Sequence, residues 1–364
     1  MKPQPDPLAL LEEARESFEA GAPSRSLALL PGSRVLPRLL RPERDLLEAE
    51  ALRAMGFFRR AEALYGRLLR SAGKGDPAFR IEAALGSAAG LRSVGHVALA
   101  AQRLSAARAE ARRAGLRGYA GRLSLEETLV DRAAGRYGIA IRRLKPAVRA
   151  ALAARDWGGA AYLLWAVGGA ERFRGNLKDS QAAFERSRRL ARRAGDAVGE
   201  GYALFGLGGV TRILGRLRDS ERWYARAGKA FQGTDDLFAR AYAACGRANA
   251  LRQLGRLGEA ERLYRRSRKL YASLEDEADL GYVDWGLGEI HFRRGDLTRA
   301  LPRFALAARA FRRHGEARGL SLALLSMARV RHSQGRTAMG ETLFRQACAL
   351  ARKAGLHTYL ESFT

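Results

Sequence analysis

The sequence predicts an all-α solenoid of about eight helical hairpins, and three observations support this fold class. The phrase LGRLRDSERWY at residues 214–224 returns as LGRLGEAERLY at residues 254–264, which is the mark of a repeat array. A glycine recurs at the same place in each copy, and from Gly95 onward these glycines are 40 residues apart. The segments on both sides of each glycine have apolar residues at helical spacing. A chain with this periodicity builds stacked hairpins rather than one globular core.

Each repeat is predicted to consist of two helices joined at the turn glycine, from which we count positions. Glycine adopts the left-handed backbone that ends a helix at no steric cost. Small residues at positions −7 and +5 let the two helices approach closely, and a large residue at position +9 fills the space beside them. The predicted turn glycines are Gly56, Gly95, Gly135, Gly175, Gly215, Gly255, Gly295 and Gly335.

The domain organisation follows from these glycines. The chain of 364 residues has no Ser/Gly-rich linker, which indicates one continuous repeat domain. We expect residues 46–355 to form the solenoid and residues 356–364 to form a short C-terminal cap or tail. Residues 1–45 are predicted to be an irregular cap or a degenerate repeat, because eight of the ten prolines lie at or before Pro77.

The sequence shows no pattern typical of a signal peptide, a membrane-spanning helix, a metal site or a catalytic site. The N-terminus lacks the apolar core of a signal peptide, and no apolar run approaches 20 residues, so we expect a cytoplasmic protein. Cys245 and Cys348 lie far apart, and the five histidines lack metal-ligand spacing. No phosphate-binding GxxxxGK[ST] motif or catalytic constellation occurs. We therefore expect no metal, no cofactor and no enzymatic activity.

The formal net charge of +27 favours an acidic partner, such as nucleic acid, an anionic membrane surface or an acidic protein. Only seven of the 65 basic residues are lysines. So lopsided a ratio in an Ala- and Gly-rich chain is also typical of GC-rich codon usage. The sequence leaves both origins of the charge open.

The pattern of small residue, turn glycine, second small residue and large residue resembles the tetratricopeptide repeat over roughly residues 46–355. The 40-residue period is similar to the longer variety seen in kinesin light chains, cell-polarity adaptors and bacterial regulators. The resemblance implies a right-handed superhelical solenoid. It also implies that the first helix of each repeat lines a concave groove in which a partner segment is held.

The first helices carry a stripe of residues at positions −13, −10, −6 and −3, which share one helix face. The resemblance places this stripe in the groove. Tyrosine, tryptophan and arginine dominate binding hot spots, and arginine grips carboxylates through two hydrogen bonds. The predicted partner-binding residues are Tyr162, Trp165, Arg172, Tyr202, Phe205, Arg212, Tyr242, Asn249, Arg252, Tyr282 and Trp285.

Two alternatives stay open at this point. The tyrosines are also suited to packing between successive first helices, while Gly169 and Gly209 in the same stripe are interpreted as room for a guest backbone. The second helices are rich in arginine, which is typical of a solvated face or of salt-sensitive nucleic-acid binding. We predict a non-enzymatic scaffold or adaptor that binds a peptide segment or an acidic partner protein, including a regulator of a partner enzyme. The alternative is a nucleic-acid-associated protein that binds through its arginine-rich surface.

Overall fold

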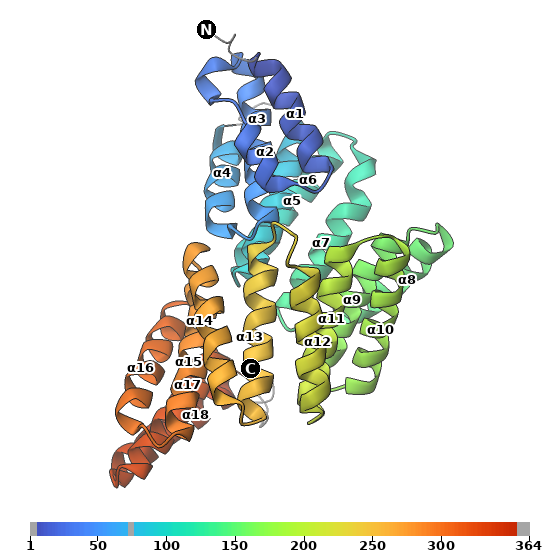
Figure 1. Ribbon diagram of the computed structural model, residues 1–364. Coiled ribbons are helices and arrows are strands. Elements are labelled where there is room, and N and C mark those ends of the chain that lie inside the picture. The colour runs from blue at the N-terminus through green and yellow to red at the C-terminus, as the bar shows by residue number, and fades with distance from the viewer. Residues whose placement is uncertain (1–5, 72–75, 355–364) are drawn as a thin grey trace. The chain divides into compact units, whose positions relative to one another are not determined.

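The computed structural model describes residues 6–71 and 76–354, and every regular element within them is a helix (Figure 1). Consecutive helices pair as antiparallel hairpins, which confirms the predicted all-α repeat architecture. The chain divides into two compact units. The first contains Met1–Gly199 and Gly233–Leu237, and the second contains Glu200–Gln232 and Phe238–Thr364.

The first unit begins with a short hairpin and continues with four repeats. Three short 3-10 segments interrupt it, at Ser33–Val35, Arg38–Leu40 and Arg117–Tyr119. Its α-helices are α1 (Pro7–Glu19), α2 (Pro23–Leu29), α3 (Arg41–Ala54), α4 (Phe58–Ser71), α5 (Pro77–Ser93), α6 (Val97–Arg113), α7 (Ala120–Ala133), α8 (Tyr137–Ala153), α9 (Trp157–Phe173) and α10 (Leu177–Arg193).

The second unit contains four further repeats. Its first helix, α11, starts within the last residues of the first unit. The helices are α11 (Ala197–Ile213), α12 (Leu217–Ala230), α13 (Leu237–Gln253), α14 (Leu257–Ser273), α15 (Glu277–Arg293), α16 (Leu297–Arg313), α17 (Ala317–Ser333) and α18 (Thr337–Lys353).

All eight predicted turn glycines have a left-handed backbone, with φ between +74° and +92°. At Gly255 the amide donates to the carbonyl oxygen of Arg252 at 3.1 Å, and the Arg256 amide donates to that of Leu251 at 2.9 Å. These two bonds satisfy carbonyl groups that the end of α13 would otherwise leave unpaired. The first helix of the repeat therefore ends at the glycine, and the second helix starts directly after it.

The second helices end in the same way, which the sequence analysis did not anticipate. Gly115, Gly195 and Gly315 have φ between +67° and +69° at these ends. Arg155 and Glu275 occupy the equivalent positions with φ of 57° and 56°. A side chain is strained in this conformation, because its β-carbon crowds the backbone.

The predicted close approach within each hairpin is present. A β-carbon on Gly208, at position −7, would lie 2.9 Å from the ring of Tyr224, at position +9. Ser220, at position +5, donates its hydroxyl to the Gly208 carbonyl oxygen at 2.7 Å. Glycine is required at position 208 because the aromatic ring occupies the space of a side chain. The core lies along these contacts, within hairpins and between successive ones.

The ends of the array differ from the regular repeats. Gly21, with φ of +77°, joins α1 and α2 into the short N-terminal hairpin. Helix α3 begins at Arg41 and so extends across the predicted boundary between residues 45 and 46. The predicted C-terminal cap at residues 356–364 lies outside the described residues.

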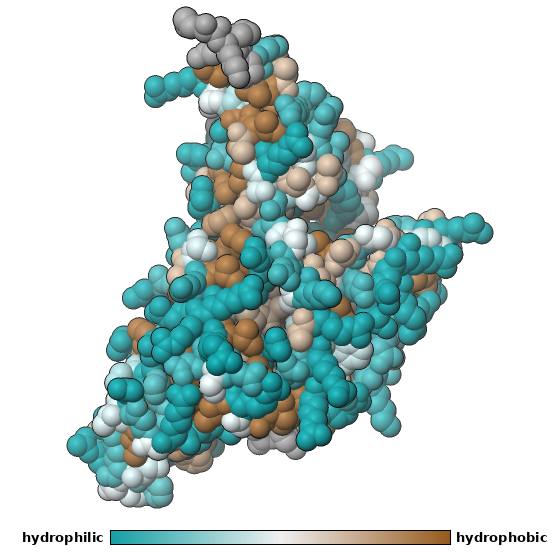
Figure 2. Space-filling view, in the orientation of Figure 1, coloured by the Kyte–Doolittle hydropathy of each residue, from teal (hydrophilic) through white to brown (hydrophobic). Residues whose placement is uncertain are grey.

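Hydrophilic side chains dominate the face of the molecule drawn in Figure 2. This agrees with a chain in which 28% of residues are charged. None of the helices in the described part of the chain combines the length and the apolar character needed to cross a membrane.

Candidate partner-binding face

In the first unit, the predicted stripe on α9 presents one well-exposed aromatic side chain. Tyr162 is 42% exposed, and its ring stacks on Trp165 with centroids 5.8 Å apart and planes 27° apart. The Tyr162 hydroxyl makes no hydrogen bond with any residue that the structure describes. Trp165 is half-buried, and the guanidinium carbon of Arg132 lies 4.9 Å from its ring centroid. Arg172 is half-buried and lies 5.0 Å from the ring centroid of Phe173.

The space beside Gly169 is occupied by the protein itself. Nη1 of Arg132 lies 2.7 Å from the point where a β-carbon on Gly169 would stand. The interpretation of this glycine as room for a guest backbone is therefore wrong. Glycine at this position lets the arginine of the preceding repeat lie between α7 and α9.

In the second unit, the tyrosines at position −13 are half-buried against other aromatic rings. Tyr202 packs edge-on against Phe231, with centroids 5.2 Å apart. Tyr282 packs in the same way against Phe311 at 4.6 Å, and its hydroxyl donates to Glu316 at 3.0 Å. Tyr242 stacks on Phe205, with centroids 3.9 Å apart. These tyrosines each keep part of their surface accessible, while their rings are held in place.

The remaining predicted rows of the second unit lie inside the protein. Trp285 is 0% exposed and Arg252 is 1% exposed, and the guanidinium carbon of Arg252 lies 4.7 Å from the Trp285 ring centroid. Phe205 and Arg212 are also buried. These side chains pack between successive first helices, as the alternative interpretation of the stripe proposed for its tyrosines.

A polar chain links three positions of the repeat at Gly255. The hydroxyl of Tyr264 donates to Oδ1 of Asn249 at 2.6 Å, and Nε of Arg252 donates to that hydroxyl at 3.3 Å. Burial raises the pKa of Tyr264 to about 12, so the phenol stays protonated and remains a donor. Asn249 is thus engaged in a hydrogen bond within the repeat.

The polar chain continues across the following repeats through Glu289, which is 1% exposed. Nη1 of Arg252 lies 3.9 Å from this carboxylate, and Ser326 and Arg329 each donate to it at 3.1 Å. Nε1 of Trp285 donates to the Ser326 hydroxyl at 2.9 Å. This buried carboxylate on α15 accepts hydrogen bonds from α17 and forms an ion pair with α13, so it links three successive first helices.

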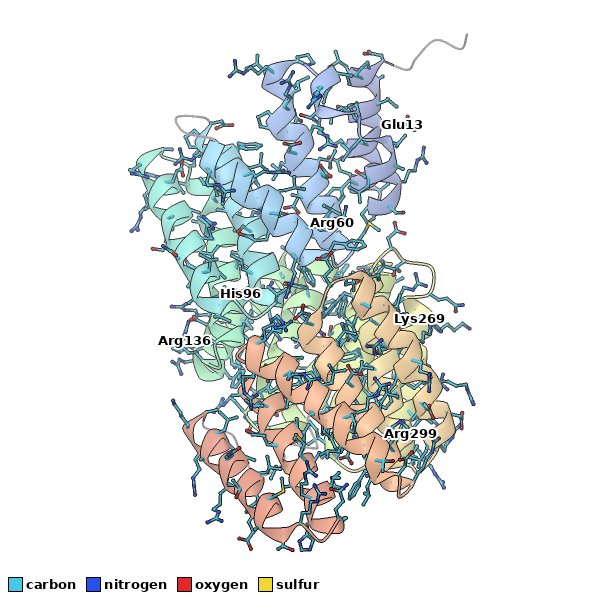
Figure 3. The ribbon with its side chains drawn as sticks, turned by 90° about the vertical axis from the view of Figure 1, so that its left-hand side faces the viewer. Glu13, Arg60, His96, Arg136, Lys269 and Arg299 are labelled. Carbon is cyan, nitrogen blue, oxygen red and sulfur yellow. The ribbon has the colours of Figure 1, made fainter. Side chains whose placement is uncertain are left out.

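Second helices carry a series of exposed basic side chains. Lys269 on α14 points away from the helices (Figure 3). On α10, Arg186 and Arg189 are exposed and make no ion pair with a described residue. The exposed arginines of α10 are Arg186, Arg189, Arg192 and Arg193.

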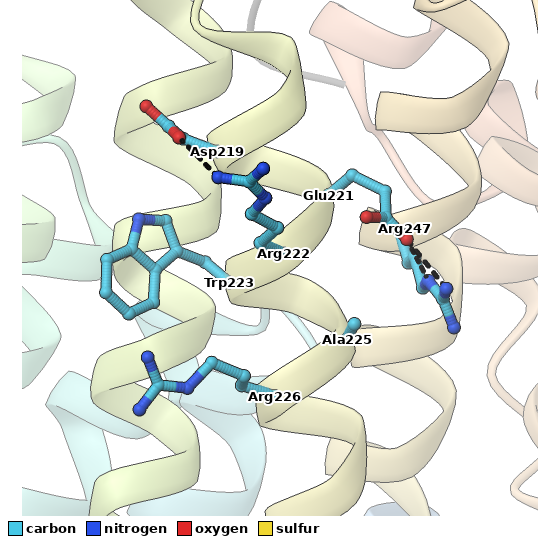
Figure 4. Close-up of a pocket in the computed structure, with 7 residues that line it drawn as sticks. All are labelled: Asp219, Glu221, Arg222, Trp223, Ala225, Arg226 and Arg247. Carbon is cyan, nitrogen blue, oxygen red and sulfur yellow. Dashed lines mark hydrogen bonds and ion pairs between the residues drawn. The ribbon is translucent and has the colours of Figure 1, made fainter.

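A shallow depression of about 520 Å³ lies over α12 (Figure 4). The guanidinium carbon of Arg226 lies 5.1 Å from the ring centroid of half-buried Trp223, and Arg247 pairs with Glu221 at 2.6 Å. The lining residues are Asp219, Glu221, Arg222, Trp223, Ala225, Arg226 and Arg247. The depression mixes both signs of charge and brings together no nucleophile with a base.

The described residues contain no cluster of three or more side chains that could hold a metal ion. Burial raises the pKa of Cys245 to about 12, so its thiol is protonated at neutral pH and unreactive. The face offers aromatic surface and hydrogen-bonding side chains, such as Tyr162 and Tyr282.

Two features of the site escaped the sequence analysis, although the sequence carried a signal for one. Gly246 and Gly286 stand at position −9, where a side chain would overlap the tyrosine at position +9 of the preceding repeat. Their 40-residue spacing was visible in the sequence. The stack of Tyr137 on Phe173, with centroids 5.4 Å apart, joins α8 to the end of α9 and had no periodic signal.

Comparison with known proteins agrees with this architecture. A family model described as the MalT-like TPR region matches residues 200–363. No curated protein matches the sequence.

Among solved structures, a Rap protein complexed with competence and sporulation factor aligns with a TM-score of 0.70 at 13% identity, over 96% of this chain and 98% of that chain. The apo form of the quorum sensor NprR from B. thuringiensis aligns with a TM-score of 0.60 at 14% identity, over 94% and 98%. The apo form of RapI aligns with a TM-score of 0.55 at 11% identity, over 96% and 98%. At these identities the likeness concerns the fold.

Proposed function

Because the chain folds as a tetratricopeptide-repeat array like that of the Rap protein, we propose that it is a cytoplasmic, non-enzymatic scaffold. Its first helices bind a peptide segment or an acidic partner protein, and a regulator of a partner enzyme falls within this proposal. The observation that carries the proposal is the row of tyrosines at position −13. Tyr162, Tyr202, Tyr242 and Tyr282 recur in successive repeats and keep accessible surface.

The buried rows have a supporting role in this proposal. Arg252 and Trp285 hold neighbouring first helices at a set distance and so position the tyrosines above them. Binding to such a preformed surface costs the protein little conformational entropy, so the free energy of contact appears as affinity. Tyrosine suits this role, since it combines a large rigid ring with a polar hydroxyl.

The preference for an acidic partner comes from charge. The chain carries a net charge of +27, and Arg132 and Arg172 lie on the same stripe as Tyr162 and Trp165. A positive surface accelerates the encounter with an acidic partner and disfavours a basic one. The Rap protein, which was solved with competence and sporulation factor, is a precedent for ligand binding by this fold.

Site-specific photo-crosslinking tests the proposal, and the circular dichroism spectrum of each variant shows whether it is folded. A benzoylphenylalanine replaces one residue at a time in the full chain, which is then irradiated in nuclease-treated lysate of the native host. We expect a common crosslinked partner from positions 162, 202, 242 and 282. The matched control is Phe344 on α18, an aromatic side chain that is 53% exposed on a second helix. Crosslinks from the control, with none from the tyrosine row, would refute the proposal.

A second candidate function is association with nucleic acid through the second helices. The specific observation is that Arg186 and Arg189 on α10 are exposed without an ion pair to a described residue. Such binding ignores sequence and weakens steeply as salt increases. Binding of a labelled 20-nucleotide single strand, measured at rising salt, tests it. The Arg186→Glu, Arg189→Glu double variant should reduce this binding and leave the tyrosine-row crosslinks unchanged.

A further inference from the structure

The connector between α2 and α3, residues 30–40, presents two apolar side chains to solvent. Leu39 is 90% exposed and Val35 is 61% exposed. Among the described residues no large hydrophobic side chain is more exposed than Leu39. The connector lies within the first unit. Isolated apolar side chains are ordinary on a protein surface, whereas neighbouring ones mark a contact surface.

Helix α3 holds this connector in place. Leu36, which stands between the two apolar residues in the sequence, is only 2% exposed. Nε of Arg41 donates to the Leu36 carbonyl oxygen at 3.2 Å, and Nε of Arg44 donates to that of Pro31 at 3.1 Å. The two apolar side chains are therefore held outward on a fixed backbone, so docking them costs the chain little conformational entropy.

An exposed arginine directly precedes each of the two apolar side chains in the sequence. These arginines are Arg34 and Arg38, and neither makes an ion pair with a described residue. A guanidinium group binds phosphate through two parallel hydrogen bonds, and its alkyl stem lies along apolar surface. The connector thus combines apolar side chains with groups that bind phosphate.

The acidic side chains at the start of α3 form ion pairs elsewhere. Glu43 pairs with Arg15, and Asp45 and Glu48 pair with Arg44. These carboxylates are therefore engaged by other arginines, and the two arginines of the connector keep their charge for an external anion.

We infer that this connector is a docking surface for an anionic phospholipid membrane. Leu39 and Val35 insert among the acyl chains, while Arg34 and Arg38 stay at the level of the lipid phosphates. Binding of this kind gains affinity from buried apolar area and from attraction to anionic headgroups. The inference goes beyond the proposed function and does not depend on the tyrosine row.

The combination of apolar and basic side chains favours a membrane over other acidic partners. Nucleic acid offers phosphate groups but no apolar phase for a protruding leucine. A protein partner would need a pocket for each protruding side chain, whereas acyl chains accept both without a preformed cavity. The net charge of +27 also draws the chain to an anionic surface, which attracts basic side chains over about a Debye length.

Sedimentation of the full chain with lipid vesicles tests the inference. One set of vesicles contains phosphatidylcholine and phosphatidylglycerol at a ratio of about 2:1, and the other contains phosphatidylcholine alone. We expect binding to the anionic vesicles, and Leu39→Ser should weaken it by at least about tenfold, because the leucine side chain no longer leaves water. The matched control is Leu99→Ser, which alters another exposed leucine of the first unit and should leave binding unchanged.

A pair of double variants tests the role of the arginines. Arg34→Gln with Arg38→Gln should weaken binding to the anionic vesicles by at least about tenfold. The matched control is Arg112→Gln with Arg113→Gln, which removes two exposed charges from α6. It should weaken binding by less than about threefold, because these charges contribute only long-range attraction.

A fluorescent label shows whether position 39 enters the bilayer. Cys245 is buried, so replacing the half-buried Cys348 with serine leaves no accessible thiol among the described residues. Leu39→Cys and Leu99→Cys in this background each receive an environment-sensitive fluorophore. We expect the anionic vesicles to shift the emission to shorter wavelength at position 39 and not at position 99.

Three results would overturn the inference. In the first, Leu39→Ser has a native circular dichroism spectrum and binds the anionic vesicles as tightly as the original chain. In the second, the label at position 39 keeps its emission when vesicles are added. In the third, the original chain does not bind the anionic vesicles, and a benzoylphenylalanine at position 39 that then crosslinks a protein would assign the connector to a protein partner.

Discussion

Arg132 reaches from α7 to α9 and places its Nη1 2.7 Å from the point where a β-carbon on Gly169 would lie. The same guanidinium covers the ring of Trp165. A glycine and an arginine 37 residues apart in the sequence therefore form one packing unit. Side chains of the neighbouring repeat fill the space beside such glycines in the first helices. The kind of side chain there predicts how each glycine should respond to substitution.

Alanine substitutions at three glycines should have graded effects. Gly246→Ala places a methyl group against the ring of Tyr224, and Gly208 lies against the other side of that ring. We therefore expect the free energy of unfolding to fall by about 1–3 kcal/mol. Gly169→Ala should cost less, because it displaces only the flexible end of Arg132. Gly228→Ala in α12 meets no atom within 4 Å and should stabilise by about 0.5–1 kcal/mol. Urea unfolding measures all three, and equal effects would contradict the packing argument.

Replacing the two strained residues at the ends of second helices with glycine should stabilise the fold. Arg155 and Glu275 adopt φ near +57° and +56°, where the repeats around them use glycine. A left-handed conformation costs a residue with a β-carbon about 1 kcal/mol. Arg155→Gly and Glu275→Gly should each raise the free energy of unfolding by about 0.5–1 kcal/mol. The reverse change, Gly195→Ala, should lower it, and a stabilising Gly195→Ala would show that no strain is stored there.

The hairpin architecture could be predicted from the sequence because regularly spaced turn glycines mark the ends of the first helices. A turn glycine at each 40-residue interval requires a helix end there, and Gly208 beside Tyr224 shows that the small and large positions meet as expected. These features depend only on the spacing of residues within one repeat. They could therefore be predicted without knowing how neighbouring repeats pack.

The exposure of the stripe could not be predicted in the same way. Tyr162 and Trp285 both belong to the stripe, yet one is 42% exposed and the other is fully buried. Helical periodicity assigns a residue to a face but does not state how closely the next helix covers that face. The burial of Arg252 depends on a ring and a carboxylate one repeat further along, which a single-repeat pattern does not contain.

The buried pair of Arg252 and Glu289 should show strong thermodynamic coupling. Glu289→Gln removes the buried carboxylate beside Arg252 and should destabilise by about 3 kcal/mol. Arg252→Met should destabilise by less, because Glu289 keeps its contacts with Arg329 and Ser326. The double variant should be less destabilised than the sum of the two, by about 1–3 kcal/mol. A double-mutant cycle with urea unfolding measures this coupling. If the two changes in the free energy of unfolding were strictly additive, Arg252 and Glu289 would not interact at their separation of 3.9 Å.

The first turn of α15 contains two carboxyl groups whose pKa values move in opposite directions. Burial, followed by the nearby charges of Asp276 and Glu316, raises the pKa of Asp279 well above its ordinary value. The folded state then binds the proton of Asp279 more tightly than the unfolded state. Its contribution to stability is present at acidic pH and is lost as pH rises through the raised pKa. We therefore expect Asp279→Asn to raise the unfolding temperature at pH 7.

The neighbouring Glu277 supplies the control of opposite sign. Hydrogen bonds from His314 and then Arg313, both at 2.9 Å, hold its pKa below the ordinary value. Its contribution is present above the pKa of an unfolded glutamate, near 4.3, and is lost as pH falls through the lowered pKa. Glu277→Gln should thus lower the unfolding temperature at pH 7, and the difference should shrink toward pH 3. Circular dichroism melts of both variants between pH 3 and pH 8 measure this. If Asp279→Asn also lowered the unfolding temperature at pH 7, the favourable interaction of a charged Asp279 with the N-terminus of α15 would outweigh the cost of its burial.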